Sequence, residues 1–323
     1  MKSFMRNLMI MGLMLKRWLL ITTGRSYYHQ EQPLGKLFKP GDILGYYNDL
    51  TAKTKWRGPV SECGFPLNRK EDGKLVLVPT TIAQKALGHY DMWLLGRDRW
   101  NLDEFMLLAN WLRNHQDGQG GWPIWPALSL ACISDYSAMV QGEAISVAVR
   151  AHQQDGDPSW IKMAEAAARL MLTPVEKGGT ARYTPEGIIL EEFPSEYPKA
   201  VLNGWFFALY GLYDLMLAGA GRVLDIEQVL SETLRALSVF LPRYDAGYWS
   251  YYDTCHNLSS PFYHKLHIAQ LYALEMTFPA VGTVAGLYRR KFEQQWSKGT
   301  NKLRAVVVKG LQKLSRPPEV MLR

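Results

Sequence analysis

The sequence of 323 residues contains few cysteines and lacks a recognisable metal-binding spacing. Three cysteines, Cys63, Cys132 and Cys255, lie far apart, and an odd number cannot form a complete set of disulfides. We therefore expect free thiols and a reducing compartment. The seven histidines include no His-Glu-x-x-His or similar pattern. We expect neither a catalytic metal nor a cofactor.

The sequence also lacks a long apolar run. Residues 1–25 carry five basic residues and no acidic one. Their uninterrupted apolar stretch, Leu8–Leu15, is far shorter than the roughly 20 residues that cross a bilayer. A small-residue Ala-x-Ala cleavage site is absent as well. We expect a cytoplasmic protein whose N-terminal amphipathic helix lies on a membrane or on the protein's own core.

Positive charge is concentrated at one end of the chain. Residues 289–323 hold ten Lys or Arg against Glu293 and Glu319, whereas the whole chain has a net charge of +7. A basic end attracts a polyanion or an anionic membrane surface, and a solvated, partly helical tail is the alternative. We expect an acidic polymer other than nucleic acid as the partner of this end. Peripheral membrane contact and a homodimer remain open.

Aromatic residues are abundant, with 11 Trp and 17 Tyr. Such side chains combine an apolar body with a polar end, which suits sugar stacking as well as core packing. From residue 80 onward, segments with helical periodicity alternate with short loops bounded by Pro, Gly or Asp. The eight predicted helices are Thr81–Leu95, Leu102–His115, Ser137–Gln153, Ser159–Leu172, Val201–Ala218, Asp225–Leu241, Tyr263–Phe278 and Val281–Gln295.

These patterns predict a mainly all-α fold, an α/α toroid or barrel of helical hairpins, over residues 80–297. An irregular segment with a β-hairpin around Glu71–Gly73 precedes it, at residues 26–79. A basic tail follows it at residues 298–323. The predicted organisation is thus a basic apolar N-terminal segment, an irregular segment, one catalytic domain and a tail.

Two loops of the helical region resemble each other. Residues 117–125 and 245–253 each contain Asp, Gly and then several aromatics between two helices. Repeated helical hairpins indicate a closed or curved array, so we expect both loops to meet at one mouth. Glu191 and Glu192 lie in a further loop, because prolines follow them before a helix that is apolar on every face.

Several motifs occur in order between residues 115 and 275. They are Gly120–Ile124 (GGWPI), Tyr136–Ser146 (YSAMVQGEAIS), Glu191–Pro194 (EEFP), Val201–Gly204 (VLNG), Gly211–Leu215 (GLYDL), Tyr252–Asp253 (YD) and Tyr263–Leu271 (YHKLHIAQL). Together they resemble the C-terminal catalytic domain of the D-glucuronyl C5-epimerase family. The resemblance implies an isomerase that converts glucuronate to iduronate within heparosan-type glycosaminoglycan chains.

The resemblance also implies the residues of the site. Tyr252 and Tyr263 correspond to catalytic groups, and Glu192 is the other ionisable residue in a matching motif. Epimerisation at C5 removes a weakly acidic proton next to a carboxylate and returns one from the opposite face, so two acid/base groups are needed. The candidate substrate-binding residues are Trp122, Tyr136, Gln141, Tyr197, Asn203, His264 and His267. Trp122 and Trp125 suit either stacking on a sugar or packing, and Asn203, His264 and His267 suit either sugar binding or a role in the core. Candidate cations for the uronate carboxylate are Arg182, Lys199 and Lys265.

Two positions depart from the family pattern. The tyrosine of the family's EEYP motif is Phe193 here, with Tyr197 as a replacement four residues on, and a family arginine is Cys255. The leading interpretation is an epimerase with a two-base mechanism. A uronate polysaccharide lyase would form the same carbanion and then expel the 4-oxygen. A non-catalytic glycan-binding or assembly protein would keep the binding surface and lose the chemistry.

Overall fold

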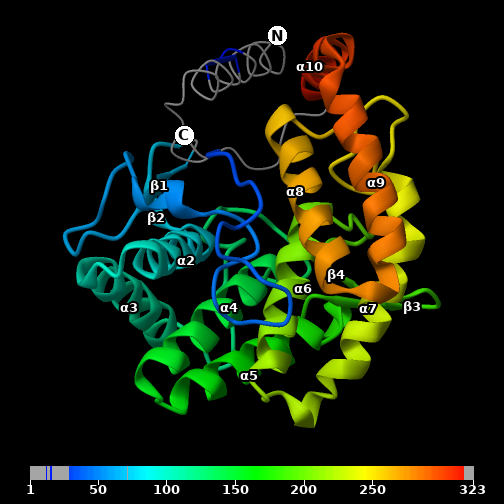
Figure 1. The fold of residues 1–323 in the computed structure, drawn as a ribbon. Coiled ribbons are helices and arrows are strands. Elements are labelled where there is room, and N and C mark those ends of the chain that lie inside the picture. The colour runs from blue at the N-terminus through cyan, green and yellow to red at the C-terminus, as the bar shows by residue number, and fades with distance from the viewer. Residues whose placement is uncertain (1–11, 13–14, 17–28, 71, 316–323) are drawn as a thin grey trace.

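The computed structural model describes residues 12, 15–16, 29–70 and 72–315, and this part of the chain is mainly helical (Figure 1). All eight helices predicted from periodicity are present, and a ninth follows them. The helices are α2 (Pro79–Gly96), α3 (Arg99–Asn114), α4 (Ala138–Asp155), α5 (Ser159–Leu172), α6 (Leu202–Leu217), α7 (Ile226–Phe240), α8 (Pro261–Thr277), α9 (Pro279–Ser297) and α10 (Gly299–Ser315).

Strands are few and short in the described residues. The predicted hairpin is confirmed, because β1 (Leu67–Arg69) and β2 (Leu75–Leu77) pair antiparallel on either side of the expected turn. A second hairpin, β3 (Ala181–Thr184) with β4 (Gly187–Leu190), was not predicted. It leads directly into the loop that carries the adjacent carboxylates Glu191 and Glu192.

The helices form consecutive hairpins, α2 with α3, α4 with α5, α6 with α7 and α8 with α9. The first helix of each hairpin touches the first helix of the next, so α2, α4, α6 and α8 make an inner layer. Helices α4 and α6 are buried around most of their circumference, whereas α3, α5 and α7 bury one face. This arrangement confirms the predicted all-α toroid of helical hairpins.

Two glycines allow the inner helices α4 and α6 to pack closely. A Cβ added at Gly142 would lie 2.4 Å from the carbonyl oxygen of Phe207, and one at Gly211 would lie 2.3 Å from that of Gly142. Real side chains do not tolerate such distances, so each glycine faces the backbone of the other helix. The inner layer is consequently dense, as expected for protein interiors.

The irregular segment before α2 joins the two ends of the helical array. His29 makes edge contacts with Phe262 of α8, at 5.0 Å between ring centroids. Tyr46 and Tyr47 are fully buried among the inner helices. The 3₁₀ turn η1 (Thr51–Thr54) then packs on α2. The segment therefore runs from α8, in the last hairpin, to α2, in the first hairpin. It closes the array between these two helices.

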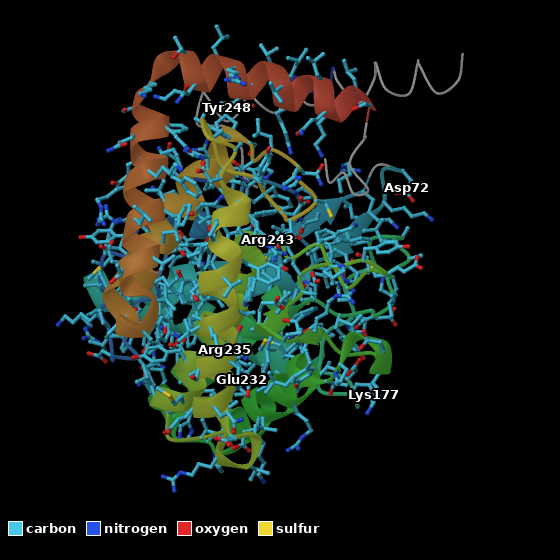
Figure 2. All side chains as sticks on the ribbon, turned by 90° about the vertical axis from the view of Figure 1, so that its right-hand side faces the viewer. Asp72, Lys177, Glu232, Arg235, Arg243 and Tyr248 are labelled. Atoms are coloured by element: carbon cyan, nitrogen blue, oxygen red, sulfur yellow. The ribbon has the colours of Figure 1, made fainter. Side chains whose placement is uncertain are left out.

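The predicted N-terminal amphipathic helix falls in residues 1–25, which lie almost wholly outside the described residues. None of the helices in the described part of the chain combines the length and the apolar character needed to cross a bilayer. At the other end, the predicted basic tail is helical through Ser315, as helix α10. This helix runs along one edge of the molecule (Figure 2).

Candidate functional site

Three side chains from separate segments meet where the loop after β4 faces the start of α8. The Tyr252 hydroxyl donates a hydrogen bond of 3.4 Å to Oε1 of Glu192. The rings of Tyr252 and Tyr263 are in contact, at 4.8 Å between centroids. All three side chains keep partial solvent access. The structure thus brings together the three residues predicted to be catalytic, and none of the three is fully buried.

The first turn of α6 shapes the space around Glu192. A Cβ added at Gly204 would lie 2.3 Å from Oε2 of Glu192, so only glycine leaves room for this carboxyl group. The Asn203 side-chain amide donates to the same oxygen at 3.5 Å. Its own Oδ1 is buried and has no hydrogen-bond partner in the structure. The structure therefore places Asn203, a predicted substrate-binding residue, beside the carboxyl group.

The surroundings of Glu192 favour its neutral form. Burial raises the pKa of Glu192 to about 8, and the charges of Glu191 and Asp253 act in the same direction. The hydrogen bond from Tyr252 opposes this shift. Burial, followed by the negative charge of Glu192, raises the pKa of Tyr252 well above its ordinary value. A carboxyl group with a pKa near the working pH suits proton transfer better than this phenol does.

The adjacent carboxylate, Glu191, has a structural environment. It is fully buried, forms an ion pair of 3.0 Å with Nε of Arg182 and accepts a hydrogen bond of 3.0 Å from the Ala200 amide. Burial is the main reason that the pKa of Glu191 is raised, while these partners oppose the shift. Glu191 fixes the loop, and this leaves Glu192 to face the two tyrosines.

Two predicted substrate-binding histidines lie inside the protein instead. His264 and His267 have no exposed surface, and their Nδ1 atoms lie 2.8 and 3.0 Å from the Ser250 hydroxyl. The His264 ring also stacks on Trp249 at 3.8 Å. Burial lowers the pKa of His264 to about 3 and that of His267 well below its usual range. Both rings are therefore neutral and enclosed, and they hold the aromatic loop onto α8, which is the core role that the sequence left open beside sugar binding.

Three further predicted binding residues also hold a loop through hydrogen bonds. Trp122 is only 1% exposed, and its indole N–H donates to the Leu112 carbonyl. Gln141 is fully buried and donates to the Gly120 carbonyl, while the Tyr136 hydroxyl donates to Asp117. The printed hydrogen bonds of these side chains thus join α3, the first glycine–aromatic loop and α4, whereas Oε1 of Gln141 is buried without a partner in the structure and Tyr136 lines a surface cavity. Substrate contact by these three residues stays a prediction.

The same loop nevertheless reaches the site through a different aromatic residue. Trp125 stacks on Phe193 with ring centroids 4.1 Å apart, which places it against the loop that carries Glu192. Phe193 occupies the position where the family pattern has tyrosine. Tyr197, the predicted replacement, is 72% exposed. Cys255 is exposed as well, with its sulfur 3.9 Å from the Pro198 carbonyl.

The cations predicted to hold a uronate carboxylate are engaged elsewhere. Arg182 pairs with Glu191, and Lys265 pairs with Glu31. The ammonium group of Lys199 lies 5.6 Å from the centre of the Phe193 ring, on the loop rather than beside the tyrosines.

A polar cluster that the sequence analysis missed adjoins Glu192. Glu143 of α4 is fully buried and accepts a hydrogen bond of 2.8 Å from Gln84 of α2, while its Oε2 has no partner in the structure. Burial raises the pKa of Glu143 to about 8, and the charge of Glu192 adds to this effect. Burial lowers the pKa of Lys53 in η1 to about 8, although the charge of Glu143 opposes that shift. A carboxyl group among the mainly apolar residues of a predicted helix was the available signal.

Comparison with known proteins assigns the chain to a family. Residues 119–294 match the family described as D-glucuronyl C5-epimerase C-terminus. The match covers more than half of the chain, and the chain belongs to this family.

The individual relatives share less than a third of their residues with this chain over the matched regions. A D-glucuronyl C5-epimerase of Caenorhabditis elegans is 29% identical over 229 residues, which are 62% of this chain and 37% of that protein. An uncharacterized protein of Methanocaldococcus jannaschii is 31% identical over 138 residues, 42% of this chain and 44% of that protein. The chain therefore spans less than half the length of both relatives. A solved structure described as a UGL variant with dGlcA-Glc-Rha-Glc covers 70% of this chain and 61% of its own, with a TM-score of 0.42 and 15% identity.

Proposed function

We propose that this protein inverts C5 of D-glucuronate to give L-iduronate within a glucuronate-containing, heparosan-like polysaccharide. The observation that carries the proposal is the meeting of Glu192, Tyr252 and Tyr263 from three separate segments. Membership of the epimerase family supports the type of reaction. The proposed activity needs no change in oxidation state and no leaving group, because one C–H bond breaks and another forms on the opposite face.

Glu192 and Tyr252 would act as one proton-transfer unit. Their oxygens are 3.4 Å apart, so a sugar ring cannot lie between them and both must address the same face of C5. Ionised Glu192 would remove the proton, since its pKa of about 8 leaves a useful ionised fraction at neutral pH. Tyr252 would donate a hydrogen bond to the ionised carboxylate. Tyr263 would return a proton to the other face.

The carbanion formed at C5 is stabilised only if its neighbouring carboxylate is neutralised. In this proposal Lys53 supplies the positive charge. Three observations support it: η1 packs on α2, Gln84 of α2 bonds Glu143, and Glu143 interacts electrostatically with both Lys53 and Glu192. These contacts support a cation in the same polar network as the proposed base, whereas Arg182 and Lys265 are paired with other carboxylates.

The test is proton exchange at C5 of a glucuronate polymer in heavy water, followed by NMR. Tyr263→Phe keeps the ring contact with Tyr252 and removes the group that returns the proton to the other face, so formation of iduronate from glucuronate, followed in the same NMR spectra, should fall by about 10² to 10⁴. Tyr272→Phe is the matched control, because Tyr272 lies on the same helix and is 42% exposed. It should form iduronate at the wild-type rate.

Other outcomes would contradict this proposal. Formation of iduronate at the wild-type rate in Tyr263→Phe would exclude this tyrosine from the mechanism. An ultraviolet-absorbing unsaturated uronate would indicate a lyase. Absence of exchange in the wild-type protein on every glucuronate polymer tested would favour a non-catalytic glycan-binding protein.

A further inference from the structure

Helix α10 presents an apolar stripe to solvent. Leu303, Val307 and Leu311 are 68%, 53% and 61% exposed, and their spacing of four residues places them along one face. Large exposed apolar side chains in a continuous row mark an interaction surface more often than scattered ones do. The helix lies along the edge of the molecule with side chains that point away from the body (Figure 2).

Basic side chains flank this stripe, and Gly299–Ser315 contains no acidic residue. Arg304 lies 3.8 Å from the centre of the Tyr248 ring, and Lys302 lies 4.4 Å from that of Trp296. Figure 2 shows Tyr248 directly beneath α10. These contacts hold the two cations at the sides of the helix, between the protein body and the exposed stripe.

The opposite face of α10 is fixed to the protein. Ala305 is buried, and Gln312 accepts a hydrogen bond of 2.9 Å from the Leu258 amide and donates one of 3.2 Å to the His256 carbonyl. Because the inner face is held in place, the stripe is a fixed feature of the surface and not the varying side of a loose tail.

We propose that α10 docks this protein on an anionic lipid surface, with Leu303, Val307 and Leu311 inserted among the lipids. Basic flanks beside an apolar face are the arrangement by which amphipathic helices bind such surfaces. An acidic polysaccharide would complement the charge but offer nothing to the apolar stripe. The basic residues of α10 do not complement the positive charge of a second copy of the chain. They do not complement residues 1–25 either, because that segment carries five basic and no acidic residues.

The test is co-flotation of the full-length protein with phosphatidylcholine vesicles that contain or lack phosphatidylglycerol. The wild-type protein should bind the anionic vesicles, and added salt should weaken this binding. A variant with Leu303→Ser, Val307→Ser and Leu311→Ser should bind at least about tenfold more weakly. The matched control carries Leu107→Ser, Val223→Ser and Leu287→Ser, which lie on other exposed surfaces, and should bind like the wild type.

Several results would overturn this inference. These are equal vesicle binding by the two triple variants, no vesicle binding by the wild type, or a loss of dimers in the α10 variant by light scattering. If the α10 variant binds vesicles like the wild type but binds heparosan more weakly, the α10 face is assigned to the polysaccharide. The C5 exchange rate on a soluble polymer is measured in parallel, and the α10 variant should retain it, so failure of docking is separable from failure of the proposed epimerase activity.

Discussion

The carboxyl groups of Glu191 and Glu192 are neighbours in sequence but meet different surroundings. Arg182 and the Ala200 amide satisfy the first, whereas Tyr252 and Asn203 approach the second from the open side. The difference arises because successive side chains of an extended loop point in opposite directions. A paired, enclosed carboxylate positions the backbone, and its neighbour is left available for proton transfer.

The raised pKa of Glu192 predicts how the exchange rate depends on pH. A carboxyl base acts only when ionised, and burial raises the pKa of Glu192 to about 8. We therefore expect kcat/KM for C5 exchange to rise about tenfold per pH unit below pH 8, to pass through a maximum near pH 8 and to fall above it, where Lys53, whose pKa burial lowers to about 8, loses its charge. Glu192→Gln should lower the maximum by about 10² to 10⁴.

Glu196→Gln provides the control for this pH profile. Glu196 lies in the same loop and is exposed, so its replacement should leave both the maximal rate and the rise up to pH 8 in place. A rise that is complete near pH 4 in the wild-type enzyme, or an unchanged maximal rate in Glu192→Gln, would assign the base to another group.

At the scale of elements, α10 supports the loop that carries Tyr252. Gln312 bonds the backbone of His256 and Leu258, and the Tyr252 amide donates to the Asn257 carbonyl. Gln312→Ala should therefore lower kcat about tenfold through a displaced Tyr252. The maximum near pH 8 should stay, because Gln312 touches neither Glu192 nor the tyrosine rings.

Rescue distinguishes positioning from a general loss of stability. Gln312→Glu keeps an acceptor for the Leu258 amide and should recover most of the rate, whereas Ser315→Ala, whose hydroxyl bonds only within α10, should change nothing. Wild-type kcat in Gln312→Ala would show that the loop holds its shape without α10.

Periodicity predicted the helices well because most of them carry an apolar face and are bounded by Pro, Gly or Asp. The hairpin β3–β4 escaped prediction, because its strands have four residues each and are fixed by packing on α7. Packing between distant segments also decides which way the side chains of the site point, and the sequence does not show this. Sequence cannot tell whether a Trp or His in a functional motif faces a ligand or supports the loop beside it, as His264 and Trp122 do.

At the scale of the whole molecule, closure of the helical array depends on the segment before α2. Tyr47 stacks on Tyr210 of α6 with ring centroids 3.9 Å apart, and its hydroxyl donates to Asp214 at 2.9 Å. Asp214 also accepts from Arg150 of α4 at 2.6 Å, and Arg150 donates to the Leu44 carbonyl at 3.2 Å. One buried charge pair therefore ties the irregular segment to two inner helices. Composition alone did not reveal this role.

Asp214→Asn tests that tie. The amide oxygen can still accept from Tyr47, but the guanidinium of Arg150 is left buried without its counter-charge. Removal of one partner of a buried ion pair costs about 3 to 5 kcal/mol, and for a protein of this size that corresponds to a fall in Tm of roughly 5 to 15 °C. Thermal and urea unfolding followed by circular dichroism measure the change. Asp103→Asn is the matched control, because its ion pair with Arg99 has a similar length of 2.9 Å but is exposed, and it should cost no more than about 1 kcal/mol. Equal losses in the two variants would mean that the inner helices and the irregular segment hold together without the buried pair.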